Sequence, residues 1–318
     1  MDFEIKGDRG VSLVCPVFNS EASLAELYQR LVSALSSLAA EYEIIFVNDQ
    51  SSDKSGKIIA SLAAQDPRVQ GIDLMRNYGQ HNALLCGIRA ARFGTIVTLD
   101  DDLQHPPEEI TKLLERLNEG YDVVYGTPIK EQSGWARALA SRGVRLALRN
   151  VVGYEVAKNV SAFRAFRTQL REAFSGYHTS FVSIDVLLTW ATTRFAAVTV
   201  RFDPRFAGSS NYRLSSLLRF ALDMTTGFST KPLQLASLIG FLFTIFGMCV
   251  LLYVIGRYFV QGSVPGFPFL ASIIAIFSGA QLFALGVIGE YLARMHFRLM
   301  DRPAYVVRSV TPKRSQSH

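Results

Sequence analysis

The strongest constraint on the fold of this chain is the disappearance of charge near its C-terminus. Residues 232–256 contain no Asp, Glu, Lys or Arg, and residues 258–289 contain none either, with only Arg257 between them. Each run exceeds the roughly 20 residues that a helix needs to cross a bilayer. The alternative, one buried core helix split by a loop, is disfavoured because both runs are apolar on every side and long enough to span. The sequence therefore predicts a transmembrane hairpin, with a turn at Pro265–Pro268.

Basic residues lie at the two ends of this hairpin, and the loop between its spans has only Arg257 beside it. Lys231 precedes the first span, and six basic residues follow the second: Arg294, Arg298, Arg302, Arg308, Lys313 and Arg314. The positive-inside rule then places both termini and the large N-terminal domain in the cytoplasm, at the inner (cytoplasmic) membrane. The charged N-terminus leads into a strand pattern and does not read as a signal peptide. Because much of the net charge of +6 lies beside a membrane span, we expect lipid as a partner and no nucleic acid.

Composition divides the chain into four expected parts. Residues 1–212 form a cytosolic domain, 213–230 an amphipathic interface helix, 231–292 the two-helix hairpin and 293–318 a basic cytosolic tail. The apolar stripe of residues 213–230 fits packing on the soluble domain and a membrane-interface position about equally well. Self-association through small residues of the spans is also expected, and the candidates are Gly240, Gly247, Gly279 and Gly286.

The soluble part alternates between strand-like and helix-like periods. Apolar runs of strand length occur at Val11–Phe18, Tyr42–Val47, Val69–Met75, Thr95–Leu99 and Tyr121–Tyr125. Between them, Ser23 and Glu26 have capping-box spacing at the start of one helical segment, and Pro106–Asn118 is a second that ends before Gly120. This alternation predicts an α/β fold with a mostly parallel sheet flanked by helices.

The segment Thr98–Pro107 joins an apolar strand to three consecutive aspartates and a proline-started helix. Side chains alternate along a strand, so we expect Asp100 and Asp102 to point the same way at its carboxyl end. Carboxylates packed together need a cation, and Mg²⁺ or Mn²⁺ bridging a nucleoside diphosphate is the simplest one. By itself the triplet also fits a solvated turn that caps the next helix.

A second loop, Asn48–Asp53, leaves a predicted strand at the same edge. Its Asp49 can accept a hydrogen bond from a base imide or a ribose hydroxyl, which would complete a pocket for a nucleoside and a metal-bound diphosphate. Neither common glycine-rich phosphate loop is present, so neutralisation of the phosphates falls to the metal. The cysteines Cys15, Cys86 and Cys249 are scattered and argue against a disulfide framework or a zinc site.

Five separated motifs occur in order along the chain: Pro16–Asn19, Asn48–Asp53, Arg76–Gln80, Leu99–Pro107, and Gly289–Arg294 with Arg302–Pro303. Together they resemble glycosyltransferase family 2, and within it the polyprenyl-phosphate branch of dolichol-phosphate mannose synthases and undecaprenyl-phosphate glucosyl and aminoarabinose transferases. The resemblance covers almost the whole chain. It implies a GT-A fold and inverting transfer of a sugar from a UDP- or GDP-linked donor to an undecaprenyl or dolichyl phosphate at the cytoplasmic membrane face.

The resemblance also implies roles for individual residues. Nucleotide binding falls to Pro16, Asn19, Glu21, Asp49, Asp100 and Asp101. Asp100, Asp102 and Gln104 would hold the metal, and Arg164, Arg205, Ser209 and Tyr212 would contact the acceptor phosphate. Asp100, Asp102, Arg164 and Arg205 would carry the catalysis. Arginine suits this task because its planar guanidinium matches a phosphate.

This chain departs from the family pattern at several positions. Ser20 separates Asn19 from Glu21, Gln50 stands where glycine is common, and Asn211 stands where lysine is frequent. Two other hypotheses follow. A processive polysaccharide synthase would need a Gln-x-x-Arg-Trp element, which neither Trp135 nor Trp190 provides, and a non-catalytic membrane scaffold would keep the fold without turnover. The transferred sugar depends on the loop Gly126–Trp135 and is not readable from sequence.

Overall fold

The structure is a computed structural model of the whole chain, and it describes residues 10–39, 41–128, 159–179, 182–204, 231–261, 266–300 and 302–312. The chain divides into two compact units. Residues Met1–Leu214 and Asp301–His318 form the α/β unit, and Ser215–Met300 form the helical unit. The expected interface helix, residues 213–230, lies outside the described residues.

An eight-stranded sheet forms the centre of the α/β unit, with the order β7-β5-β6-β4-β1-β2-β3-β8. The strands are β1 (Val11–Val17), β2 (Tyr42–Asn48), β3 (Val69–Leu74), β4 (Thr95–Thr98), β5 (Val123–Pro128), β6 (Arg164–Arg167), β7 (Phe195–Val200) and β8 (Val307–Thr311). β4, β1, β2 and β3 are parallel neighbours, whereas β6 and β8 run antiparallel to the strands beside them. The four parallel strands therefore carry their carboxyl ends to one edge of the sheet.

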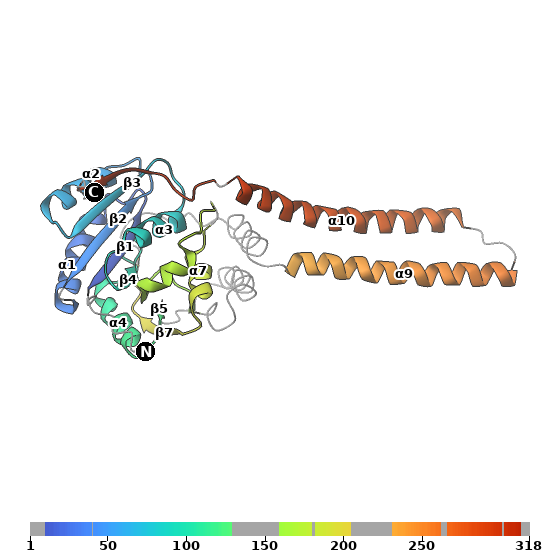
Figure 1. Cartoon of the computed structure of the whole chain (residues 1–318), viewed down its shortest axis with the longest axis horizontal. Helices are drawn as coiled ribbons and strands as arrows, with labels where there is room; N and C mark the ends of the chain where they lie inside the picture. Colours follow the sequence, from blue (N-terminus) through green and yellow to red (C-terminus); the bar gives the residue numbers. More distant parts are fainter. Residues whose placement is uncertain are drawn as a thin grey trace. The chain divides into compact units, whose positions relative to one another are not determined.

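Helices cover both faces of this sheet (Figure 1). They are α1 (Leu24–Leu38), α2 (Ser55–Gln65), α3 (Gln80–Ala90), η1 (Pro107–Glu109), α4 (Ile110–Asn118), η2 (Thr168–Phe174) and α7 (Ile184–Ala191). α1, α2 and α4 pack in one apolar core with Leu13 and Phe46, and α3, η2 and α7 pack in a second core with Val14 and Ile45. Because successive residues of β1 and β2 face opposite cores, these strands are mostly apolar on both sides, and the buried Ser12 of β1 donates a hydrogen bond to Glu43 of β2 at 2.8 Å.

The strand and helix pattern predicted from the sequence is confirmed. The five expected strands correspond to β1–β5, and their ends differ by a few residues at most. The helix expected at Pro106–Asn118 is formed by η1 and α4, and Gly120 follows it with φ +100°, as its expected role at the helix end requires. β6, β7 and β8 were not predicted. β6 (RAFR) and β8 (VRSVT) contain charged residues, whereas β7 (FAAVTV) has an apolar run that was not recognised as a strand.

The helical unit contains two helices that are long and apolar enough to cross a membrane: α9 (Lys231–Gln261) and α10 (Phe267–Leu299). Large apolar side chains on both are exposed, for example Phe241 at 62% and Phe283 at 52%. α9 and α10 contact each other where the Phe277 ring lies against Gly247 and Phe243. Gly247 thus serves a contact within the chain, whereas the structure leaves open space around Gly240, Gly279 and Gly286.

The part of the chain after α10 differs from the tail that we expected. α10 itself continues to Leu299, whereas its apolar stretch of membrane-spanning length, Ile276–Ala293, ends close to the boundary expected at residue 292. Residues Val307–Thr311 then form β8 at the edge of the sheet, where β8 pairs with β3. The basic composition of residues 293–318 predicted a cytosolic tail and did not indicate a strand, because an edge strand pairs on one side only and the residues of β8 are exposed or half-exposed.

The closeness of α3 to the sheet gives a test of the fold. A Cβ at Gly87 would lie 2.3 Å from Val14 Cγ1 in the strand below, whereas a Cβ at Gly176 would meet nothing within 4 Å. Gly87→Ala should therefore destabilise the protein by about 1–3 kcal/mol through overpacking. Gly176→Ala should change stability by less than about 0.5 kcal/mol. Thermal unfolding of both purified variants in detergent measures the difference, and equal stability of the two variants would contradict this packing.

Candidate active site

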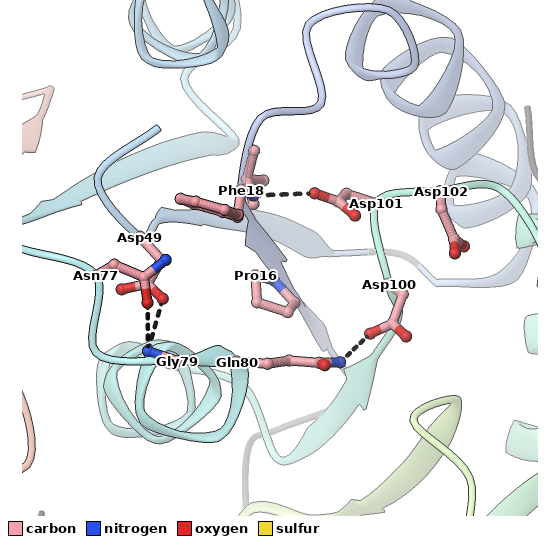
Figure 2. A pocket seen from close by; sticks show the side chains of 10 residues that line it. Pro16, Phe18, Asp49, Asn77, Gly79, Gln80, Asp100, Asp101 and Asp102 are labelled. Atoms are coloured by element: carbon pink, nitrogen blue, oxygen red, sulfur yellow. Dashed lines mark hydrogen bonds between the residues drawn. The ribbon is translucent and has the colours of Figure 1, made fainter. Parts of the chain in front are cut away.

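A solvent-open cavity of about 250 Å³ lies where the parallel strands end (Figure 2). It is lined by Pro16, Val17, Phe18, Asp49, Asn77, Gly79, Gln80, Asp100, Asp101 and Asp102. These residues come from the ends of β1, β2, β3 and β4 and the loops that follow them. Carboxyl ends of neighbouring parallel strands are where open α/β sheets bind ligands. The structure thus brings together the aspartates that the sequence placed in one pocket.

Asp49 lies at one end of this cavity and is 3% exposed. Its two carboxylate oxygens accept hydrogen bonds from the backbone N–H groups of Tyr78 (2.7 Å) and Gly79 (2.8 Å). Burial raises the pKa of the Asp49 carboxyl, and the two backbone bonds oppose that rise. Each carboxylate oxygen has a second lone pair, so Asp49 can still accept a bond from a ligand N–H or O–H.

Asp100 lies at the other end, next to Asp101 and Asp102. Burial and the charges of Asp102 and Asp101 raise the pKa of Asp100 to about 7, although Arg164 and a hydrogen bond from Gln80 oppose the rise. The Gln80 side-chain amide donates this bond to Asp100 Oδ1 at 2.6 Å. Three carboxylates thus lie close together, and among the described residues the opposing effects of Arg164 and Gln80 do not cancel the rise in the pKa of Asp100.

The turn after β4 that carries Asp100, Asp101 and Asp102, here called the acidic turn, differs in geometry from our expectation. β4 ends at Thr98, so the alternation of a strand does not set the directions of Asp100 and Asp102. The turn sets them instead. Asp101 is directed toward the loop after β1, where its carboxylate accepts a bond from Phe18 N, as Figure 2 shows, and another from Ser20 Oγ. Asp102 accepts a bond from the backbone N–H of Gln104 at 3.1 Å. The three aspartates nevertheless line one cavity.

The capping box predicted at the start of α1 is not formed. Ser23 occupies the N-cap position but makes no side-chain cap bond. Its hydroxyl donates instead to the Asp101 carbonyl oxygen at 2.6 Å and to the Ser20 carbonyl oxygen at 3.2 Å. Ser23 therefore ties α1 to the acidic turn, a contact between distant residues that spacing along one helix cannot reveal.

Asn19 and Glu21, expected to bind the nucleotide, do not line the cavity. Asn19 has φ +55°, and its side-chain oxygen accepts bonds from the backbone N–H (2.8 Å) and hydroxyl (3.1 Å) of Ser52. Glu21 Oε2 accepts a bond from Lys54 N at 2.9 Å, and Glu21 N donates to Asp53 Oδ2 at 3.0 Å. Both residues thus join the loop after β1 to the loop after β2.

Arg164, expected to contact an acceptor phosphate, is 1% exposed and does not line the cavity. Its guanidinium forms a buried ion pair with Asp185 and donates from Nε to Thr98 Oγ1 at 3.1 Å. Asp185 also accepts a bond from the Tyr125 hydroxyl at 3.0 Å. Arg164 would have to leave this network to touch a phosphate, but its charge acts on Asp100 from a distance by lowering the pKa of that carboxyl.

Gln104, expected at the metal, is likewise absent from the residues that line the cavity. Its backbone N–H donates to Asp102, and its carbonyl oxygen accepts a bond from Asp203 N at 2.8 Å. The next residue, His105, is buried between the rings of Phe163 and Phe202, and this packing agrees with a structural role rather than a metal ligand. The segment around Phe202 and Asp203 therefore packs against the acidic turn.

Three of the expected acceptor residues, Arg205, Ser209 and Tyr212, lie outside the described residues. So does most of the loop expected to select the sugar, since only Gly126–Pro128 of that loop are described. Their assignment stays a prediction.

Five residues that line the cavity had no individual role predicted from the sequence: Val17, Phe18, Asn77, Gly79 and Gln80. Phe18 lines the cavity with 49% of its surface exposed, and Gln80 bonds Asp100 from the start of α3. Both stand in motifs that we singled out, directly after Val17 and Gly79. An exposed aromatic residue at the end of a buried strand was a usable signal for Phe18, whereas the bond from Gln80 joins loops that only the fold brings together.

The raised pKa of Asp100 predicts a pH-dependent stability of the metal-free protein. Because the folded-state pKa lies above the unfolded-state value, the favourable contribution of protonated Asp100 is fully present below about pH 4 and is lost as pH rises through about 7. Asp100→Asn should therefore raise the thermal unfolding midpoint by about 2–4 °C at pH 8 and leave it unchanged at pH 4. Asp122→Asn, outside the cavity, is the control. An Asp100→Asn effect that is the same at both pH values would contradict the prediction.

The buried ion pair predicts a second effect on stability. Arg164→Met should lower the free energy of unfolding by about 3–5 kcal/mol, since it leaves the Asp185 charge buried without its partner. The double variant Arg164→Met/Asp185→Leu should recover most of this loss. Arg116→Met breaks an exposed pair with Glu119 and should cost less than about 1 kcal/mol. Chemical denaturation of the variants in detergent compares them, and a single variant as mild as Arg116→Met would show that the pair is unimportant.

Comparison with known proteins agrees with this geometry. A family model described as glycosyl transferase family 2 matches residues 12–174, which include β1–β4 and the aspartates of the cavity. The undecaprenyl-phosphate 4-deoxy-4-formamido-L-arabinose transferase of Shewanella sediminis (strain HAW-EB3) is 36% identical over 305 residues, and the match covers 94% of this chain and 92% of that protein.

Solved structures share the fold at lower identity. Glucosyl-3-phosphoglycerate synthase of Mycobacterium tuberculosis, in complex with Mn²⁺, uridine diphosphate and glucosyl-3-phosphoglycerate, matches with a TM-score of 0.50 at 19% identity. The match covers 69% of this chain and 78% of the synthase. A further structure of the same synthase matches with a TM-score of 0.50 at 17% identity over the same shares. The aspartates of the cavity lie within the matched family domain, and the chain belongs to glycosyl transferase family 2.

Proposed function

We propose that this protein transfers a sugar from a nucleotide-sugar donor to a polyprenyl phosphate at the cytoplasmic face of the inner membrane, with inversion at the anomeric carbon. The observation that carries the proposal is one cavity with Asp49 at one end and three aspartates at the other, in a chain that also has two helices of membrane-spanning length. The relative that matches over 94% of this chain is named an undecaprenyl-phosphate sugar transferase.

The nucleoside occupies the end of the cavity at Asp49 in this proposal. Asp49 is fixed by two backbone bonds, so its carboxylate is held ready to accept the imide N–H of uracil or the corresponding N–H of guanine. Pro16 and the exposed Phe18 ring offer an apolar surface beside it. Both UDP and GDP fit this chemistry, and UDP is the nucleotide held by the structural relative.

The residues at the other end fit a divalent cation bound together with a diphosphate. Asp100 and Asp102 are oxygen ligands of the kind that Mg²⁺ and Mn²⁺ prefer, and their mutual repulsion favours a cation. Among the described residues, no group of three or more His, Cys, Asp and Glu side chains could hold a metal. Donor phosphates would therefore complete the coordination. A bound cation would stabilise the negative charge that develops on the departing diphosphate.

The acceptor reaches the site beside the acidic turn. The backbone bond from Asp203 to Gln104 holds this part of the chain two residues before Arg205. Arg205, Ser209 and Tyr212 then follow as the proposed phosphate contacts. A phosphate monoester has its second pKa near 6, so it is largely a dianion at neutral pH and needs no strong general base. Arg164 acts without touching the acceptor: it forms the buried ion pair with Asp185, and its charge lowers the pKa of Asp100.

The helices α9 and α10 serve as the membrane anchor. Basic residues lie before the first and after the second, so the positive-inside rule puts the α/β unit in the cytoplasm. A polyprenyl phosphate carries its headgroup at the membrane surface, so an enzyme anchored in the same membrane meets this acceptor at high local concentration.

The proposal is tested by product formation. Purified protein is incubated with undecaprenyl phosphate, Mn²⁺ or Mg²⁺, and a panel of UDP- and GDP-sugars, and mass spectrometry identifies a glycosylated lipid phosphate. Asp102→Ala should lower kcat by at least about 10²-fold and abolish Mn²⁺-dependent UDP binding, because one of two metal carboxylates is lost. Asp122→Asn should leave both unchanged.

Two outcomes would contradict the proposal. A wild-type protein that binds UDP with Mn²⁺ but glycosylates no lipid in the whole panel would have a different acceptor. A protein without any metal-dependent binding of UDP or GDP would be a scaffold that keeps only the fold.

A further inference from the structure

The chain returns to the sheet after α10. β8 pairs with β3 in antiparallel register, from Gly71 with Thr311 to Leu74 with Val307, and Figure 1 shows this C-terminal segment beside β3. The register shifts between Asp73 and Leu74, because Arg308 is an extra residue on the β8 side. A bulge of this kind redirects a side chain at the edge of a sheet. Here it lies at the end of β3, one residue before the loop that lines the cavity.

Both backbone groups of Met75 are bonded to the C-terminal segment. Met75 N donates to the Val306 carbonyl oxygen at 2.9 Å, and the Met75 carbonyl oxygen accepts a bond from Arg308 Nη2 at 3.1 Å. The next residues, Arg76–Gly79, form the nucleotide loop, which leads from β3 to α3. This loop supplies the two backbone N–H groups that fix Asp49. The C-terminal segment therefore holds the residue from which the nucleotide loop starts.

The same segment also packs against α3, the helix that follows the nucleotide loop. Ala304 is 3% exposed and packs in the core that includes Leu74 and Ala83. The Arg89 guanidinium of α3 lies 5.8 Å from the centre of the Tyr305 ring, and Tyr305 packs at the edge of the same core. The nucleotide loop thus connects two elements that residues 302–312 bind on both sides.

A second chain of contacts leads from β8 to Asp49 itself. Ser309 Oγ donates to Asp73 Oδ2 at 3.1 Å, and Asp73 Oδ1 accepts a bond from Asn48 Nδ2 at 2.7 Å. Asn48 Oδ1 in turn accepts a bond from Ser51 N at 3.0 Å. Asn48 and Ser51 lie on either side of Asp49 in the sequence. The position of Asp49 therefore depends on β8 through the strand side as well as through the nucleotide loop.

We propose that residues 302–312 are a positioning element of the nucleotide site, and that Arg308 and Ser309 are its positioning residues. Neither residue lines the cavity, so both act through the nucleotide loop and Asn48. The identity of the ligand rests on the proposed function. The residues that position the nucleotide end of the cavity include residues 302–312, which follow α10 in the chain. Donor binding therefore requires the chain through β8. A loop that is fixed before binding loses less entropy when the donor binds, so the contribution appears in affinity.

The test compares the double variant Arg308→Ala/Ser309→Ala with the wild-type protein in detergent. Hydrogen exchange of the free protein should become faster at the amides of Tyr78 and Gly79 and remain unchanged in β1 and α4. UDP in the presence of Mn²⁺ should bind about three- to tenfold more weakly, as expected from the loss of exposed hydrogen bonds. KM for the sugar donor should rise by the same factor while kcat stays within twofold of the wild-type value.

Two further variants complete the design. Arg308→Lys keeps a donor for the Met75 carbonyl and should recover most of the affinity for UDP. Arg116→Ala removes an arginine of α4, whose contacts are with Glu119 and Tyr121 of the same region, and should change neither exchange nor binding.

The proposal is overturned if the double variant keeps wild-type exchange at Tyr78 and Gly79 and wild-type UDP affinity. It is also overturned if exchange rises equally throughout the sheet, or if kcat falls while KM is constant, since β8 would then have a general structural or a catalytic role. Exchange and UDP binding need no acceptor and no turnover. A wild-type protein that forms no glycosylated lipid would therefore refute the proposed function. The role of residues 302–312 would still be decided by the exchange and UDP-binding measurements.

Discussion

The arrangement of this site depends on the repulsion among three carboxylates that the fold holds at one edge of the sheet. Asp100 is affected most, because Asp101 and Asp102 surround it and burial removes the water that would screen them. The protein offsets part of this cost with the Gln80 amide and with the distant charge of Arg164. The pKa of Asp100 remains raised despite these two contacts. A site with such neighbouring carboxylates favours binding of a cation together with an anionic ligand.

Loops that bear this charge must be held in place by other contacts. Asp101 bonds the loop after β1, Ser23 bonds the acidic turn, and Asn19 and Glu21 join the loops after β1 and β2. The first motif thus combines Pro16, Val17 and Phe18, which line the cavity, with Asn19, which joins two neighbouring loops. A motif that identifies a family can therefore consist of residues that build the site as well as residues that touch the ligand.

Much of the fold followed from the sequence. The central strands are apolar on both sides because helices cover both faces, and this pattern marks β1–β5 within a few residues. The acidic turn and Asp49 were also found, since each directly follows such a strand. β6 and β8 were not predicted because arginines interrupt their apolar residues, whereas the apolar run of β7 was not recognised. Arg164 was placed by family resemblance at the acceptor, whereas its pairing with Asp185 is a contact across two elements that spacing does not show.

By itself the sequence determined the α/β class, the two long apolar helices and the identity of the carboxylates, because these depend on local periodicity and on the position of a residue along one strand or helix. Tertiary structure alone decided which side chains meet. In the folded protein Asp101 bonds the loop after β1, and Arg164 pairs with Asp185 in the core. Ser23 donates a hydrogen bond to the acidic turn, and β8 pairs with β3. Such contacts join residues far apart in the chain, and their geometry is set by the packing of whole elements, which no local pattern records.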